Sequence, residues 1–126
     1  MSLRHPLARV HGLGSAKEGV SHWWAQRLTA IALVPLSVWF LVWLFGLISA
    51  GPDGARAAIA QPVSAVLLIA FLVAIFWHAQ LGMQVVVEDY VHTRWLEITL
   101  QIAFKFLAFL GALAGIVAVL RIAIAG

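Results

Sequence analysis

The sequence contains no cysteine, and only 10% of its 126 residues are charged. Without cysteine the chain cannot form a disulfide, use thiol chemistry or hold an iron–sulfur cluster through thiolates. Hydrophobic residues make up 63% of the chain, against about 45 to 50% in an ordinary soluble domain. The mean hydropathy is +1.01. A chain this apolar cannot hide its hydrophobic surface in a core of its own, so we expect an integral membrane protein.

The charges that are present give no sign of a nucleic-acid partner. The formal net charge is +3 at pH 7, and the sequence pI is about 10.2. The eight lysine and arginine residues are spread along the chain and form no basic stripe. Residues 12–15 (GLGS) lack the Lys-Ser/Thr ending of a phosphate-binding loop, so nucleotide binding is not expected either.

Three long apolar segments predict three transmembrane helices. Each exceeds the roughly 20 residues that a helix needs to cross the hydrocarbon core of a bilayer. The segments lie at about 23–49, 63–87 and 95–124. The predicted fold is therefore all-α, with a membrane anchor domain over residues 23–126. Within it, Gly111 and Gly115 favour close helix packing, and Pro35 is expected to kink the first helix.

Polar segments precede and join the predicted helices. Residues 1–22 show no helical periodicity and are expected to form an N-terminal cytoplasmic arm, flexible or ordered by a partner. They lack the apolar core of a secretory signal peptide. Residues 51–62 and 88–94 are predicted to be two short polar connections, with Pro62 near the start of the second helix.

The distribution of basic residues sets the expected orientation in a bacterial inner membrane. The first loop holds only Arg56. Four basic residues precede or open the first span, namely Arg4, Arg9, Lys17 and Arg27. Because cytoplasmic segments are enriched in lysine and arginine, the N-terminus is expected in the cytoplasm and the C-terminus in the periplasm.

His78 lies deep in the second predicted span, about 15 Å along the helix from Glu88. Polar side chains at the bilayer midplane are costly and tend to be functional, and a neutral imidazole is a good ligand for heme iron. The other four histidines are outside the predicted membrane core. A six-coordinate heme would therefore need its second ligand from another chain. The alternative is a histidine that is hydrogen-bonded between helices.

Other polar residues suggest further roles. Asp89 and Tyr90 end the second span, where the phenol could donate to a quinone carbonyl while the carboxylate orients its neighbours. The alternative for Tyr90 is an ordinary interfacial tyrosine. Arg27 could snorkel to the headgroups or pair with a buried anion such as a heme propionate. Lys105 is deeper and is expected to face the helix bundle or a cofactor.

Two segments together resemble a known family. They are GSAKEGVSHWWAQRLTA, which ends at Ala30, and HAQLGMQVVVEDYVH, which begins at His78. In this order they resemble the smaller membrane-anchor subunits, of D type, of succinate dehydrogenase (respiratory complex II). The most specific feature is His78 followed eleven residues later by Asp-Tyr, combined with Arg-x-Thr-Ala at 27–30.

The resemblance implies a particular assembly. The chain would form half of a heterodimeric helix bundle with a second anchor subunit (C type), and heme b would lie between them. The iron–sulfur and flavoprotein subunits would dock on the cytoplasmic face. His78 would be an axial ligand of the heme iron and Arg27 a propionate partner. Tyr90 and Asp89 would belong to the ubiquinone site, where electrons from succinate enter the quinone pool. Succinate oxidation itself would take place in another subunit.

Two alternatives remain on the sequence alone. One is the anchor of a fumarate reductase or of another quinone-linked cytochrome b complex, which would share the heme histidine. The other is a non-redox membrane scaffold, in which His78 would serve packing only.

Overall fold

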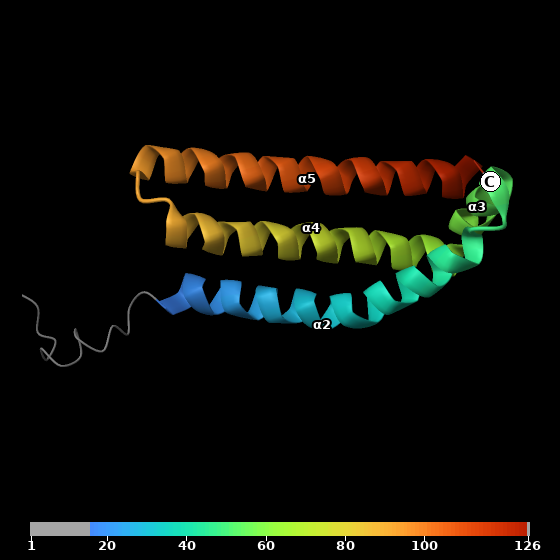
Figure 1. Cartoon of the computed structure of the whole chain (residues 1–126), viewed down its shortest axis with the longest axis horizontal. Helices are drawn as coiled ribbons and strands as arrows, with labels where there is room; N and C mark the ends of the chain where they lie inside the picture. Colours follow the sequence, from blue (N-terminus) through green and yellow to red (C-terminus); the bar gives the residue numbers. More distant parts are fainter. Residues whose placement is uncertain (1–15, 126) are drawn as a thin grey trace, which may run out of the picture.

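The structure, a computed structural model, describes residues 16–125, and these form four α-helices and no strand (Figure 1). The helices are α2 (Ala16–Leu47), α3 (Gly51–Ala60), α4 (Pro62–Tyr90) and α5 (Arg94–Ala125). The three long helices lie in one layer with α4 in the middle. Within the described residues α2 and α5 do not contact each other. The all-α prediction with three spans is confirmed.

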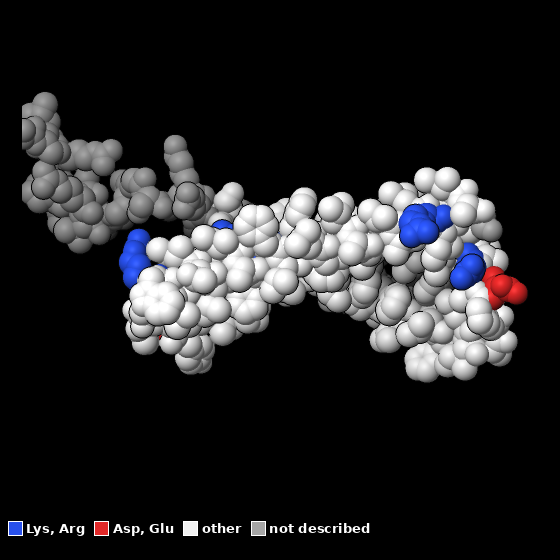
Figure 2. Space-filling model, turned by 90° about the horizontal axis from the view of Figure 1, so that it is seen from above, with Lys and Arg blue, Asp and Glu red and all other residues white. Residues whose placement is uncertain are grey.

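An apolar sequence that crosses a lipid bilayer is expected to form long helices. Backbone groups in hydrocarbon find no water, so each apolar segment satisfies its N–H and C=O groups within a helix. The 29 residues of α4 measure about 43 Å, which is longer than the roughly 30 Å of hydrocarbon. Figure 2 shows that the charged side chains on this face lie toward the two ends of the molecule, with an uncharged stretch between them. The helix ends therefore extend into the headgroup regions.

The first helix begins earlier than the sequence analysis predicts. Residues 16–22 belong to α2, so this part of the predicted arm over 1–22 is helical. Residues 1–15 lie outside the described residues. Ala, Lys and Glu at the start of α2 are good helix formers, and extending an existing helix costs little compared with nucleating one. The helix also continues through Pro35 and curves in its second half (Figure 1).

The predicted polar connection over residues 51–62 is itself mostly a helix, α3. Gly51 has a φ of 73°, a left-handed conformation that glycine adopts without strain, and it turns the chain out of α2. Pro52 then lies in the first turn of α3, where a missing N–H costs nothing. Gln61 is extended because Pro62 follows it, and Pro62 opens α4 as predicted.

The second connection is shorter than the predicted segment over 88–94. Helix α4 continues through Tyr90, and α5 already begins at Arg94. The N–H of Val91 still donates to the carbonyl of Val87 at 2.9 Å, and the N–H of Glu97 donates to that of Thr93 at 2.9 Å. Asp89 and Tyr90 therefore belong to the last turn of α4 and not to a loop.

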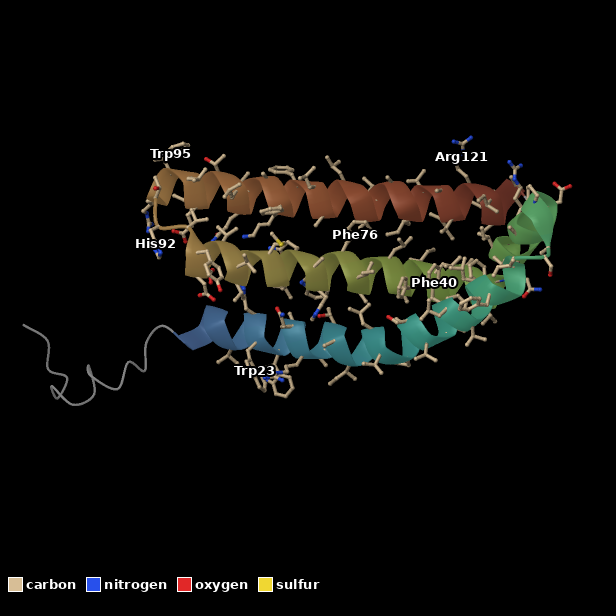
Figure 3. The ribbon with its side chains drawn as sticks, in the orientation of Figure 1. Trp23, Phe40, Phe76, His92, Trp95 and Arg121 are labelled. Atoms are coloured by element: carbon tan, nitrogen blue, oxygen red, sulfur yellow. The ribbon has the colours of Figure 1, made fainter. Side chains whose placement is uncertain are left out.

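Small residues on α5 allow close contact with α4. A Cβ atom on Gly111 would lie 2.6 Å from the ring of Phe76, and one on Gly115 would lie 3.0 Å from the side chain of Leu72. Phe76 points from α4 toward α5 in Figure 3. The packing role predicted for the two glycines is confirmed.

Helix α2 packs on the other side of α4, chiefly near the end that carries α3. The rings of Phe40 and Phe71 stack with their centroids 4.9 Å apart. Nearby, Ala65 and Leu68 of α4 form a buried cluster with Val119 of α5. No large side chain among the described residues is completely buried. The helices therefore share one thin contact layer and have no thick core.

Replacing Gly111 with alanine should destabilise the protein because the new methyl group would overlap the ring of Phe76. Overpacking of this kind costs about 1–3 kcal/mol. The matched control is Gly46→Ala, where a Cβ atom would meet nothing within 4 Å. The melting temperature of the detergent-solubilised assembly should fall for Gly111→Ala only. Equal melting temperatures for both variants would contradict the close contact.

Candidate functional site

His78 lies close to the centre of the middle helix. Helix α4 runs from Pro62 to Tyr90, so its midpoint is Phe76, and His78 is two residues beyond it. The imidazole is about 18 Å along the axis from Tyr90. This position agrees with the depth inferred from the sequence. The side chain is partly buried and faces α2.

The imidazole is held by a hydroxyl group on the neighbouring helix. Nδ1 of His78 and Oγ1 of Thr29 are 3.0 Å apart. Thr29 is one of the few buried polar residues, with 5% of its surface exposed. Its hydroxyl also lies 2.7 Å from the carbonyl oxygen of Ala25 and 3.0 Å from that of Gln26. The hydroxyl thus links the backbone of α2 to the side chain of α4.

The donors and acceptors in this group accommodate an imidazole proton on Nδ1. A threonine hydroxyl has one hydrogen, and the carbonyls of Ala25 and Gln26 can accept it. When the hydroxyl donates to one of them, its oxygen can accept a hydrogen bond from His78 in the tautomer with the proton on Nδ1. In that tautomer the lone pair of Nε2 is available. The interhelical hydrogen bond considered as an alternative is therefore present, and it leaves the second ring nitrogen available as a ligand.

Open space lies beside His78 on the same side of α4. Gly82 follows it by one helical turn, and a Cβ atom there would meet nothing within 4 Å. The groove between α4 and α5 opens on a different side, because Gln80 and Gln84 are each about 200° around the helix from Gly82.

Asp89 and Tyr90 are placed at the end of α4, away from His78. Both side chains are exposed, and Tyr90 has 79% of its surface accessible. They share the last helical turn, next to the connection that holds His92. In Figure 3, His92 and Trp95 mark this end of the layer and Arg121 the opposite end. The structure brings Asp89 and Tyr90 together, but it does not bring them to the midplane.

Arg27 is exposed on α2 and lies over an aromatic ring. Its guanidinium carbon is 5.0 Å from the centroid of Trp23, which is a cation–π contact. Arg27 is two residues from Thr29 and so lies on a different side of the helix. The contact of His78 is therefore with Thr29 and not with Arg27.

Thr29 is the residue of this site that sequence reasoning does not single out. The sequence analysis gives it only as part of Arg-x-Thr-Ala, with no role of its own. A threonine inside an apolar span is a signal, but its partner depends on the vertical register of α2 against α4. That register cannot be determined from the sequence alone.

Within residues 16–125 the site offers one ligand and no complete metal centre. No three histidine, aspartate or glutamate side chains in this part of the chain lie close enough together to hold a metal ion. A metal or heme at His78 would therefore need ligands from elsewhere.

Three long apolar helices, the middle one with an imidazole near its centre, define a multi-pass membrane protein. Residues 1–112 match the sequence model of the succinate dehydrogenase/fumarate reductase transmembrane subunit family. The chain belongs to this family.

Several relatives have sequences similar to two thirds or more of the chain. The succinate dehydrogenase hydrophobic membrane anchor subunit of Rickettsia bellii is 37% identical over 116 residues, which are 92% of this chain and 93% of the relative. That of Rickettsia typhi is 32% identical over 83% of this chain and 84% of the relative. That of Paracoccus denitrificans is 29% identical over 68% of this chain and 66% of the relative.

Proposed function

We propose that this chain is a membrane-anchor subunit of a succinate:ubiquinone oxidoreductase. In this proposal it supplies one axial ligand of a heme b that it shares with a second anchor subunit, and it forms part of the ubiquinone-reduction site. Family membership and the names of the relatives support the anchor role. The observation that carries the heme proposal is the imidazole of His78, which Thr29 holds through Nδ1 near the centre of the middle helix.

The residues around His78 fit a heme ligand. Metal-binding histidines usually donate their other ring N–H to an oxygen, which fixes the tautomer and the ring orientation. The hydroxyl of Thr29 is such an oxygen, and Gly82 leaves room beside the imidazole. The missing second ligand favours a position at the boundary with another subunit. When bound, heme b supplies a one-electron carrier inside the membrane.

Arg27 is the proposed partner of a heme propionate. It lies only about 3 Å nearer the end of α2 than Thr29 does. Its five N–H donors match the geometry of a carboxylate. The guanidinium is exposed, and its contact with Trp23 is one that a carboxylate could replace or join.

Tyr90 and Asp89 are the proposed quinone-binding residues. The phenol hydroxyl of Tyr90 donates a hydrogen bond to a carbonyl oxygen of ubiquinone, and it keeps that oxygen oriented while negative charge develops on it. Asp89, in the same helical turn, orients the neighbouring groups. Their exposure in the isolated chain supports a site that other subunits complete.

The proposed assembly places the remaining chemistry outside this chain. A C-type anchor subunit covers the side of His78, and the iron–sulfur and flavoprotein subunits dock at the end that carries Tyr90. This end and the N-terminus face the cytoplasm of a bacterial cell, and the C-terminus faces the periplasm. The positive-inside pattern supports this orientation. The absence of cysteine supports a role without iron–sulfur clusters of its own.

The names of the relatives favour succinate oxidation over the two alternatives. The family includes fumarate reductase subunits, but the relatives described above are all succinate dehydrogenase anchors. A scaffold without redox function would need no free imidazole nitrogen at the midplane.

Replacing His78 with leucine should change the heme spectrum of the assembled complex, because an axial ligand is lost. His92→Leu is the matched control, since His92 is an exposed histidine in the connection after α4. Optical and electron paramagnetic resonance spectra of the purified complexes test this. Quinone reduction can survive in His78→Leu if the iron–sulfur subunit delivers electrons to the quinone directly. An unchanged low-spin spectrum would remove His78 as a ligand.

Replacing Thr29 with valine should weaken heme binding without removing the ligand. The variant keeps the shape but leaves the Nδ1 proton of His78 without an acceptor. Loss of such a supporting group commonly lowers metal affinity about 10- to 100-fold. Thr29→Ser keeps the hydroxyl and should behave like the wild type. Heme content and midpoint potential are the measurements. A valine variant with wild-type values for both would show that the hydroxyl has no role toward the heme.

Replacing Tyr90 with phenylalanine should lower ubiquinone reduction and leave succinate oxidation by an artificial soluble acceptor intact. One neutral hydrogen bond is worth about 0.5–1.5 kcal/mol, so the loss should be roughly two- to tenfold. It would be greater if negative charge develops on the carbonyl oxygen. A tyrosine that merely rests among headgroups predicts normal turnover and normal inhibitor sensitivity, and that result would take the quinone role away from Tyr90.

A further inference from the structure

A second feature of the chain is a long groove between α4 and α5. It consists of two adjoining cavities that share the residues Trp77, Gln80 and Lys105. The cavity nearer the Tyr90 end has a volume of about 910 Å³ and extends to the first turns of α2. The deeper cavity has a volume of about 370 Å³. None of the residues assigned above to heme or quinone lines either cavity.

The cavity nearer the Tyr90 end is polar. On α4 the side chains of Gln80, Gln84 and Glu88 follow one another at intervals of one turn. They form a ladder in which the amide of Gln80 donates to Gln84 at 3.3 Å and that of Gln84 donates to Glu88 at 3.2 Å. Across the groove, α5 contributes Gln101 and Lys105, again one turn apart. Both charged residues of the groove, Glu88 and Lys105, are exposed.

The deeper cavity is apolar apart from Gln80 and Lys105, which lie at the end that adjoins the polar cavity. It continues for about 16 Å along α5, from Lys105 to Ile116. Its walls are formed by side chains of both helices, namely Val73, Phe76, Ala108, Phe109, Ala112 and Leu113. One groove thus changes from polar to apolar at the level of Trp77, which is close to the centre of α4.

Such a groove needs an occupant that is polar at one end and apolar at the other. Lys105 and three amide side chains exposed to lipid tails would be costly. The face with Gly82, which the proposed function gives to the heme and the partner subunit, is about 200° around α4 from Gln80. This step rests on the proposed function. On the opposite face, lipid is the remaining neighbour.

The order of the charges along the groove identifies the lipid. The cation, Lys105, is level with Gln80, and the anion, Glu88, is two turns nearer the helix end, about 12 Å along the axis. A lysine that extends toward the headgroups closes about half of that separation. A zwitterionic headgroup has the opposite arrangement, with its phosphate deep and its ammonium nearer to water.

We propose that this groove binds one phospholipid with a primary ammonium headgroup, a phosphatidylethanolamine. Lys105, extended toward the headgroups, holds the phosphate together with Gln101, which is one turn nearer the end of the layer. Glu88 and the carbonyl of Gln84 accept hydrogen bonds from the ammonium, which a quaternary choline group could not donate. One acyl chain lies in the apolar cavity between Phe76 and Phe109.

Titration of the purified complex with phosphatidylethanolamine, phosphatidylglycerol and phosphatidylcholine of identical acyl chains, followed by native mass spectrometry, tests the headgroup. The wild-type complex should bind phosphatidylethanolamine most tightly. Binding of phosphatidylcholine with equal affinity would overturn the role of the ammonium. Tighter binding of phosphatidylglycerol would show a simple anion site and would also overturn the proposal.

Two substitutions test the two charged residues of the groove separately. Lys105→Gln should weaken phosphatidylethanolamine and phosphatidylglycerol alike, roughly tenfold or more, because each loses a hydrogen bond to a charged group. Glu88→Gln should weaken phosphatidylethanolamine only. Arg121→Gln, an exposed cation near the other end of α5, is the control and should change neither. Wild-type lipid binding in Lys105→Gln would overturn the site.

A third variant tests the acyl chain without changing any charge. Ala112→Phe fills the apolar cavity and should lower the affinity for all three lipids. A photo-crosslinking residue at position 109 should label lipid, and labelling of the partner subunit would show that protein fills the groove. Heme spectra of the same preparations keep the two proposals apart. A groove variant that loses lipid but keeps a normal heme spectrum tests the lipid site alone. His78→Leu with an altered spectrum and normal lipid binding tests the heme ligand alone.

Discussion

A polar group in the hydrocarbon of a membrane must find its partner within the protein, because water and lipid tails supply none. At the centre of this chain the requirement is met by one hydroxyl group. The hydroxyl of Thr29 is within hydrogen-bond distance of the backbone of its own helix and of Nδ1 of His78. No buried side-chain nitrogen or oxygen among the described residues is left unpaired. The same hydrogen bond ties α2 to α4 in one register and engages Nδ1 of the imidazole.

The features that could be predicted from the sequence are those that depend on composition and short-range pattern. Apolar length alone predicts three spans, and Gly111 with Gly115 predicts the tight face of α5. The positions of the helix ends are predicted less accurately. Residues 16–22, most of 51–62 and 88–90 are helical although they are polar. Tertiary context and adjoining helices extend these segments, and residue type does not report either effect.

The candidate site was predictable only as a set of residues. The depth of His78 follows from counting along one helix, whereas its contact with Thr29 depends on how two helices slide past each other. The cation–π contact of Arg27 and the groove that contains Lys105 likewise arise from neighbouring helices. The roles of His78, Arg27, Asp89 and Tyr90 toward heme and quinone stay predictions that rest on the resemblance and on chemistry.

The arrangement of three long helices in one layer, without a fully buried large side chain, has a consequence for the life of the chain in the cell. A layer one helix thick has two broad faces and gains little free energy from its own contacts. Its persistence after synthesis therefore depends on meeting its partners while membrane proteases are present. If an unpartnered chain is degraded, the amount of complex would follow the scarcer subunit.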